Sequence, residues 1–201
     1  MKGVIGFGLA TLLMACAHSP EPTFFALSPQ NGTLAHGAPA LKVELRRAAL
    51  PGYLDRPHIV RRATAEQLEL DGDERWGAPL DEMVGATLAE DLAQRLPTCV
   101  VYTDSGAISS EPDVRVEVQL FRFERAASGD VELRAEVAVH SAQPERSSTH
   151  RFSFTQRPAS GHASEIVSTL SQLLGRLSDG ITAMIVREAA TLPAPGEPPR
   201  P

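Results

Sequence analysis

Cys16 is the residue whose chemistry is clearest, because it closes a short apolar run at the start of the chain. The run from Gly3 to Met14 follows a single cation, Lys2, and contains about a dozen apolar or small residues, whereas a membrane-spanning helix needs roughly 20. Leu13-Met14-Ala15-Cys16 has the spacing of a bacterial lipoprotein cleavage site. We therefore expect residues 1–15 to be a signal peptide, and Cys16 to carry a diacylglycerol and an N-acyl chain.

Two other interpretations of this segment are an ordinary secretory signal and a buried strand that happens to hold a cysteine. An ordinary cleavage site would not require a cysteine after Ala15, and a strand would not normally begin at residue 4 behind a lone lysine. Two or three acyl chains hold a protein firmly on a bilayer, whereas one chain holds it only marginally. The residue after the cysteine is Ala17 rather than the Asp that retains enteric lipoproteins in the inner membrane, which favours the outer membrane.

The remaining reactive side chains form no known catalytic or metal-binding pattern. The six histidines show no HExxH spacing and no clustering with cysteine, and the chain after the leader has no nucleophile elbow, phosphate loop or dinucleotide fingerprint. Ser147, Ser148 and His150 could supply a nucleophile and a base, but serine is common in polar turns. We expect no enzymatic activity, no metal and no cofactor besides the acyl chains; an envelope hydrolase that uses Ser148 and His150 is the minor alternative.

Composition narrows the partners and the redox chemistry. The formal net charge is -6, which gives no reason to expect nucleic-acid binding. The chain has two cysteines. If Cys16 is lipidated, Cys99 has no disulfide partner, and we expect it to be a buried structural thiol.

The elements that must position any site can be read from the periodicity of apolar residues. Alternation predicts half-buried strands over residues 41–45, 114–120 and 131–139, with shorter strands at 24–27, 59–62, 67–70, 99–103 and 152–154. Spacings of three to four residues predict helices over 79–96 and 162–190. The order predicts an α+β single domain: a mixed, mostly antiparallel sheet with two helices packed on one face.

Three local features refine this prediction. The apolar phase changes at Leu120-Phe121, which requires a β-bulge or a strong bend. Ser128-Gly129-Asp130 predicts a hairpin turn, and Asp71-Gly72-Asp73 predicts another. Outside the folded region of residues 24–190, we expect residues 16–23 to be a lipidated tether and the Pro-rich residues 191–201 to be a disordered tail.

The segment from Leu50 to Pro79 contains two motifs that composition does not explain. They are Tyr53-Leu54-Asp55-Arg56-Pro57 followed by Ile59-Val60-Arg61-Arg62, and Trp76-Gly77-Ala78-Pro79-Leu80. With the Phe-Phe-x-Leu opening at residue 24, they resemble the auxiliary lipoproteins of ABC-type transport systems, also called the paraquat-inducible protein C family. Residues 24–190 would then form the domain of that family.

The resemblance implies a non-enzymatic periplasmic lipoprotein that works beside an ABC transporter and an MCE-type (mammalian cell entry) substrate-binding protein in lipid transport. We also expect the protein to form homo-oligomers. Because Arg and Trp are frequent at interface hot spots, we expect a partner-binding surface at the following residues: Tyr53, Arg56, Arg61, Arg62 and Trp76.

Two alternatives stay open. Trp76 could belong to the core, with the arginines paired to Asp55, Asp73 and Glu74. The protein could also bind a lipid or another apolar ligand in a pocket of its own between sheet and helices.

Overall fold

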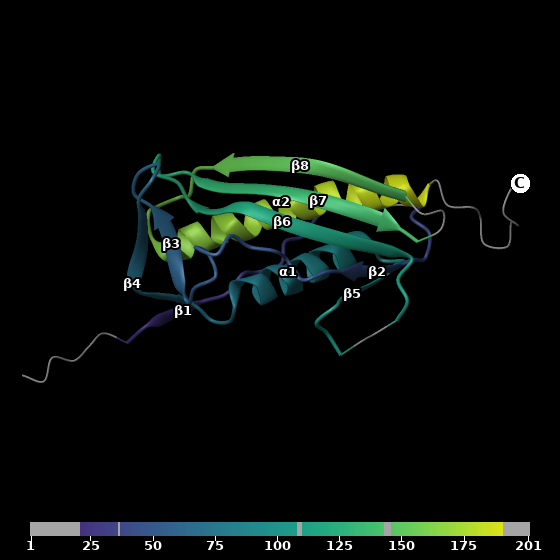
Figure 1. The fold of residues 1–201 in the computed structure, drawn as a ribbon, viewed down its shortest axis with the longest axis horizontal. Coiled ribbons are helices and arrows are strands. Elements are labelled where there is room, and N and C mark those ends of the chain that lie inside the picture. Colours follow the sequence, from purple (N-terminus) through teal and green to yellow (C-terminus); the bar gives the residue numbers. More distant parts are fainter. Residues whose placement is uncertain (1–20, 36, 108–109, 143–145, 191–201) are drawn as a thin grey trace, which may run out of the picture.

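The computed structural model describes residues 21–35, 37–107, 110–142 and 146–190 (Figure 1). Cys16, the predicted signal peptide, most of the tether and the tail therefore lie outside the described residues. The elements are β1 (Thr23–Phe25), β2 (Lys42–Leu45), β3 (His58–Arg62), β4 (Leu68–Trp76), α1 (Leu80–Arg95), β5 (Val100–Thr103), β6 (Val114–Arg125), β7 (Val131–Ser141), β8 (Arg146–Gln156) and α2 (Ala163–Ala189).

The eight described strands form one mixed sheet with β6 at its centre. The long strands β6, β7 and β8 are joined in antiparallel order. On its other side β6 pairs in parallel with β2 at its start and with β3 at its end. Strand β5 extends the sheet beyond β2, while β4 and then β1 extend it beyond β3. The predicted α+β class with a mostly antiparallel sheet is confirmed.

Both helices lie on one face of this sheet (Figure 1). Helix α2 packs against β6, β7 and β8, and α1 packs against α2 and β5. Leu88 and Leu92 of α1 and Leu170 and Leu174 of α2 are fully buried, and each such side chain contributes about 1.5–3 kcal/mol of burial free energy. A Cβ at Gly180 of α2 would lie 2.4 Å from the Phe152 ring, so this glycine allows β8 to approach the helix closely.

Two of the three local predictions are confirmed. The register of β6 against β7 shifts between Leu120 and Arg122, so Phe121 is the extra residue of a bulge. It points outward, whereas Phe123 beyond it is buried. The turn between β6 and β7 is closed by hydrogen bonds between Ala126 and the residues at 129–130, and Gly129 adopts a φ of +87° that favours glycine.

The predicted turn at Asp71-Gly72-Asp73 is wrong. Strand β4 continues through these residues, and the hairpin turns earlier, where the amides of Ala63 and Thr64 donate to the Gln67 carbonyl. Between one paired position and the next, β3 advances from residue 58 to 60 while β4 runs from 75 back to 70. The Asp-Gly-Asp segment therefore accommodates an irregular, bulged stretch of strand instead of reversing the chain.

Cys99 lies just before β5 and is half-buried rather than fully buried. Its thiol contacts the Pro39 carbonyl at 3.4 Å.

Candidate functional site

Three segments that are far apart in the sequence meet at the end of the sheet where β1 begins. The Trp76 amide donates to the Pro57 carbonyl at 2.7 Å, which joins the two motifs of the 50–79 segment. The Gly77 amide donates to the Phe25 carbonyl at 2.8 Å, which adds β1 to the same group. The loop before β3 is fixed because Leu54 is buried in the core. The resemblance motifs thus form one structural unit.

Trp76 forms part of a shallow groove in this unit. Its side chain is 5% exposed, so most of its surface packs in the core. The groove, about 360 Å³ in volume, is lined by two charged residues, Asp55 and Arg56, and by five apolar ones: Pro57, Trp76, Ala78, Pro79 and Leu80. The backbone at Arg56 is held by a hydrogen bond to the Leu54 carbonyl, and the Arg56 side chain is exposed. The groove therefore offers an apolar floor beside an accessible guanidinium.

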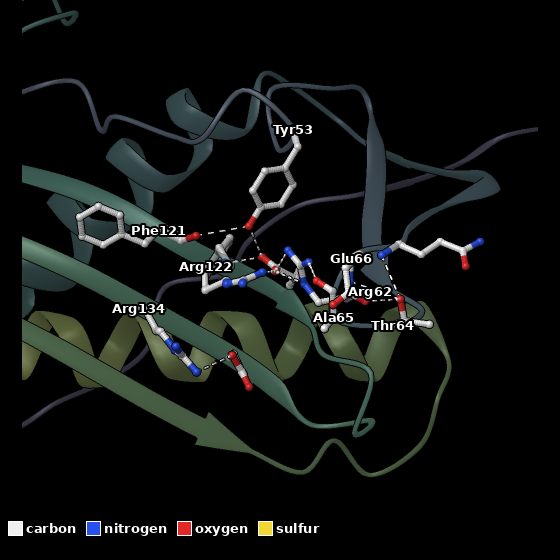
Figure 2. A network of polar contacts seen from close by, with 12 residues as sticks. Tyr53, Arg62, Thr64, Ala65, Glu66, Phe121, Arg122 and Arg134 are labelled. Carbon is white, nitrogen blue, oxygen red and sulfur yellow. Dashed lines mark hydrogen bonds and ion pairs between the residues drawn. The ribbon is translucent and has the colours of Figure 1, made fainter.

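Tyr53 and Arg62 converge on a different residue, the buried carboxylate of Glu124 (Figure 2). The Tyr53 hydroxyl donates to Glu124 Oε2 at 3.0 Å. Arg62 donates to Oε1 through Nε and Nη2 at 3.3 and 3.2 Å, and Arg122 Nη1 donates to the same oxygen at 3.0 Å. The Phe123 amide completes the set at 2.9 Å. These contacts fasten the motif loop and β3 to the end of β6.

The electrostatics of this cluster keep the phenol protonated. Burial raises the pKa of Tyr53, and the negative charge of Glu124 raises it further. The Arg62 guanidinium lies 5.7 Å from the centre of the Tyr53 ring, so it also makes a cation–π contact. A neutral phenol that donates to a carboxylate already held by two arginines is suited to holding a loop in place rather than to proton transfer.

The remaining predicted residue, Arg61, faces another acid. Its Nη2 lies 2.8 Å from Glu74 Oε2, as the alternative interpretation expected for one of the arginines. The five predicted residues thus divide into two groups: Arg56 and Trp76 line the groove, whereas Tyr53, Arg61 and Arg62 make internal contacts. Arg56 is the one of them that presents an exposed charge.

Sequence reasoning missed Glu124 and Arg122. Past the bulge, Glu124 lies on the opposite side of β6 from Phe123, and it is buried because the 53–62 segment covers it. No local pattern in the sequence indicates that cover. The phase change at Phe121 was the nearest signal, since it marks the point where β6 changes the face that it buries.

Replacing Glu124 with Gln is expected to lower the free energy of unfolding by about 2 kcal/mol, because two guanidiniums lose the charge that they face. The loss is smaller than for a fully buried pair, since the Arg122 side chain is 32% exposed. Denaturant unfolding monitored by circular dichroism measures it. Glu117→Gln, on the exposed side of the same strand, should change stability by no more than about 0.5 kcal/mol. Equal effects of the two variants would contradict the assigned role of Glu124.

Comparison with known proteins decides the family. A family model described as the ABC-type transport auxiliary lipoprotein component matches residues 25–182. The chain belongs to this family. It is therefore an auxiliary lipoprotein component of ABC-type transport systems, and this family role is non-catalytic. The match confirms the resemblance found in the sequence.

Solved structures agree with the fold. A protein described as uncharacterized, with no organism named, superposes with a TM-score of 0.70 at 20% identity, covering 83% of this chain and 99% of its own. The protein XCC0632 from Xanthomonas campestris superposes with a TM-score of 0.69 at 13% identity, covering 84% of this chain and 97% of its own. No curated protein matches the sequence.

Within the described ranges, neither helix is long and apolar enough to cross a bilayer.

Proposed function

We propose that this protein is an outer-membrane-anchored periplasmic lipoprotein that serves as a self-associating accessory subunit of an ABC/MCE system moving lipids between the two membranes. An MCE-domain protein would dock on the groove beside Arg56 and Trp76. The acyl chains on Cys16 would hold the domain at the bilayer. The family assignment supports the transport association; the membrane, the MCE partner and the lipid cargo are the added steps.

The observation that carries the proposal is that the groove lies next to β1, the first described strand after Cys16. Strand β1 begins at Thr23 and is bonded directly to the groove segment through Phe25 and Gly77. Seven residues from Cys16 reach at most about 25 Å, at roughly 3.5 Å each. A tether of this length would keep the groove close to the membrane. The effective concentration of the groove would then be high for a partner protein whose far end reaches the same membrane.

The rival function, a ligand pocket between sheet and helices, is less well supported. That space is occupied by side chains with almost no exposed surface, among them Leu120 and Leu133 of the sheet. A larger cavity of about 770 Å³ lies elsewhere, and charged groups, including Asp113, Arg115 and Arg146, line it. A lipid tail would gain little there, because apolar ligands bind in mostly apolar pockets.

The test is co-purification of the MCE protein with the lipidated protein from cells that express the native operon. Arg56→Glu should reduce recovery of the MCE protein at least tenfold, because it reverses the exposed charge beside the groove. Arg187→Glu is the matched control, since Arg187 is also exposed but lies near the end of α2. The amount of MCE protein recovered with Arg187→Glu should equal the amount recovered with the wild type.

Failure to recover any MCE protein with the wild type would contradict the partner assignment. Equal recovery with Arg56→Glu and Arg187→Glu would instead contradict the assigned groove. Native mass spectrometry that finds a stoichiometric, non-covalently bound lipid in addition to the acyl chains on Cys16 would favour the rival function.

A further inference from the structure

Among the described residues, β1, β5 and β8 each pair with a single strand, and part of β4 has no neighbour on the side of β1. Strand β8 pairs with β7 alone. Residues 68–70 of β4 pair with β3 on one side, residues 71–73 lie in the irregular stretch between paired positions, and β1 covers only positions 74–76 on the other side. In Figure 1 β4 and β8 lie at different margins of the sheet.

The β4 edge is acidic and partly apolar. Its sequence, LELDGDERW, contains four acids and one arginine. Glu69 and Asp73 are exposed. Leu68 and Leu70, at 37% and 47% exposure, are two of the exposed large apolar side chains of the described surface. Solvent-facing leucines on an open strand are a feature that natural sheets usually avoid.

The β8 edge has the opposite charge. Its sequence, RSSTHRFSFTQ, contains two arginines, one histidine and no acid. It is 11 residues long and has none of the prolines or lysines that commonly block edge pairing. Arg146 and Arg151 are exposed, the latter at 83% of its side chain although it reaches Glu136 of β7. Phe152 and Phe154 are half-buried and lie on one side of this strand.

We infer that the acidic edge of β4 in one copy pairs with the basic edge of β8 in a second copy, so that the sheet continues from protein to protein. The inference rests on the self-association in the proposed function and names the surfaces that carry it. Backbone hydrogen bonds would supply affinity, as in strand addition. Charge complementarity selects the partner, and Leu68 and Leu70 gain cover.

The charges also determine which edges meet. Pairing β8 with β8 of another copy would bring together two strands that each carry two arginines and no acid, and their like charges disfavour that pairing. Strands β1 and β5, the other two margins of the sheet, have only three and four residues and no charged side chain. The contact is therefore heterologous: each copy uses one edge to bind the next and leaves the other edge available.

Two double variants separate the edges. Glu69→Arg with Asp73→Arg reverses the β4 edge, and Arg146→Glu with Arg151→Glu reverses the β8 edge. The lipidated proteins, purified in mild detergent, are compared by native mass spectrometry and sedimentation velocity. We expect the wild type to form oligomers and each double variant alone to be monomeric, with at least tenfold weaker association.

Mixing the two variants provides the sharpest result. Each retains the edge that the other lacks, and the two reversed edges also carry opposite charges, so an equimolar mixture should form alternating oligomers although neither variant does so alone. Glu90→Arg with Arg187→Glu, exposed positions on the two helices, is the matched control and should assemble like the wild type. Circular dichroism verifies that every variant folds.

Three outcomes would overturn the inference: a monomeric wild type, a double variant that assembles like the wild type, or a mixture that stays monomeric. Arg56→Glu is expected to assemble normally, because Arg56 belongs to neither β4 nor β8. Loss of MCE binding with intact assembly therefore bears on the proposed partner alone, and loss of assembly with intact MCE binding bears on the edges alone.

Discussion

Arg95→Ala is expected to lower the free energy of unfolding by about 3 kcal/mol, because it removes a buried side chain and its hydrogen bonds, whereas the closest acid, Asp179, is 54% exposed and adds less than a buried partner would. The Arg95 side chain is 1% exposed although it lies in the last turn of α1. A long cation in that position ordinarily extends into water. Here its whole guanidinium is enclosed between the two helices and the loop that follows β1.

Each side of the guanidinium contacts a different part of the fold. Nη1 donates to the Gln30 carbonyl at 2.8 Å, and Nη2 donates to the Gly175 carbonyl of α2 at 2.9 Å. Nε donates to Asp179 Oδ1 at 2.7 Å. Alanine would leave two carbonyl groups without these donors and would open a cavity between the helices.

Asp91 gives this prediction a pH dependence. Its carboxylate accepts from the Gln30 amide at 2.6 Å and from the Ser178 hydroxyl at 3.1 Å, and burial raises its pKa while Arg95 lowers it. Without Arg95 the pKa of Asp91 rises further. A carboxyl group whose pKa is raised by folding lowers the free energy of unfolding. This loss is absent below the unfolded pKa of about 3.9 and complete above the folded pKa. The deficit of the variant should therefore be larger at neutral pH than near pH 4.

Urea unfolding at pH 7 and pH 4 measures both effects. Arg187→Ala, which removes an exposed arginine of α2, should change stability by no more than about 0.5 kcal/mol. A similarly small change for Arg95→Ala would mean that the guanidinium does not join the helices. A deficit that grows on acidification would contradict the assigned role of Asp91.

Asp91 and Arg95 also show how much of the fold could be predicted from the sequence. Both helices and their ends were predictable because leucines recur every three to four residues. Asp91 and Arg95 lie on the same buried stripe of α1 as Val84 and Leu88. Two opposite charges four residues apart on an apolar stripe are a usable signal of a buried ion pair. The leucine periodicity alone predicts the helix and does not draw attention to these charges.

The pairing of strands was less predictable for a physical reason. Alternation reports which side chains are buried, so it located β6, β7 and the bulge at Phe121. It does not report which distant strand lies alongside, and β2 is held between β5 and β6, more than 50 residues away in the chain. Asp71-Gly72-Asp73 suits a turn or a bulge equally well, and the pairing of β4 with β3 decides between them.

The candidate site was predictable only in part, because local motifs can be read from the sequence whereas long-range contacts cannot. The motifs identified the right segments, and the structure brings Arg56 and Trp76 into one groove. The burial of Glu124 depends on contacts across more than 60 residues, with Tyr53 and Arg62. A search for motifs therefore could not separate the arginine that is exposed from those that hold the fold together.

Cys16→Ser is expected to move the protein from the membrane to the aqueous fraction almost completely. A serine hydroxyl does not replace the thiol that accepts the diacylglycerol, so the acyl chains are lost, and each buried methylene of those chains contributes about 0.8 kcal/mol. The described helices offer no membrane-spanning substitute. Cys99→Ser is the matched control, because Cys99 is the other cysteine and is half-buried in the domain. It should stay in the membrane fraction.

Fractionation of the native host, followed by intact mass measurement, checks this result. The wild type should carry the mass of the acyl chains and appear in the outer-membrane fraction. Cys16→Ser protein that remains on the membrane would contradict the anchor. If the wild type carries the acyl mass but appears in the inner-membrane fraction, the anchor is correct and the proposed membrane is wrong. In that case the same reach of about 25 Å from Cys16 would place the groove beside the transporter rather than at the far end of an MCE assembly.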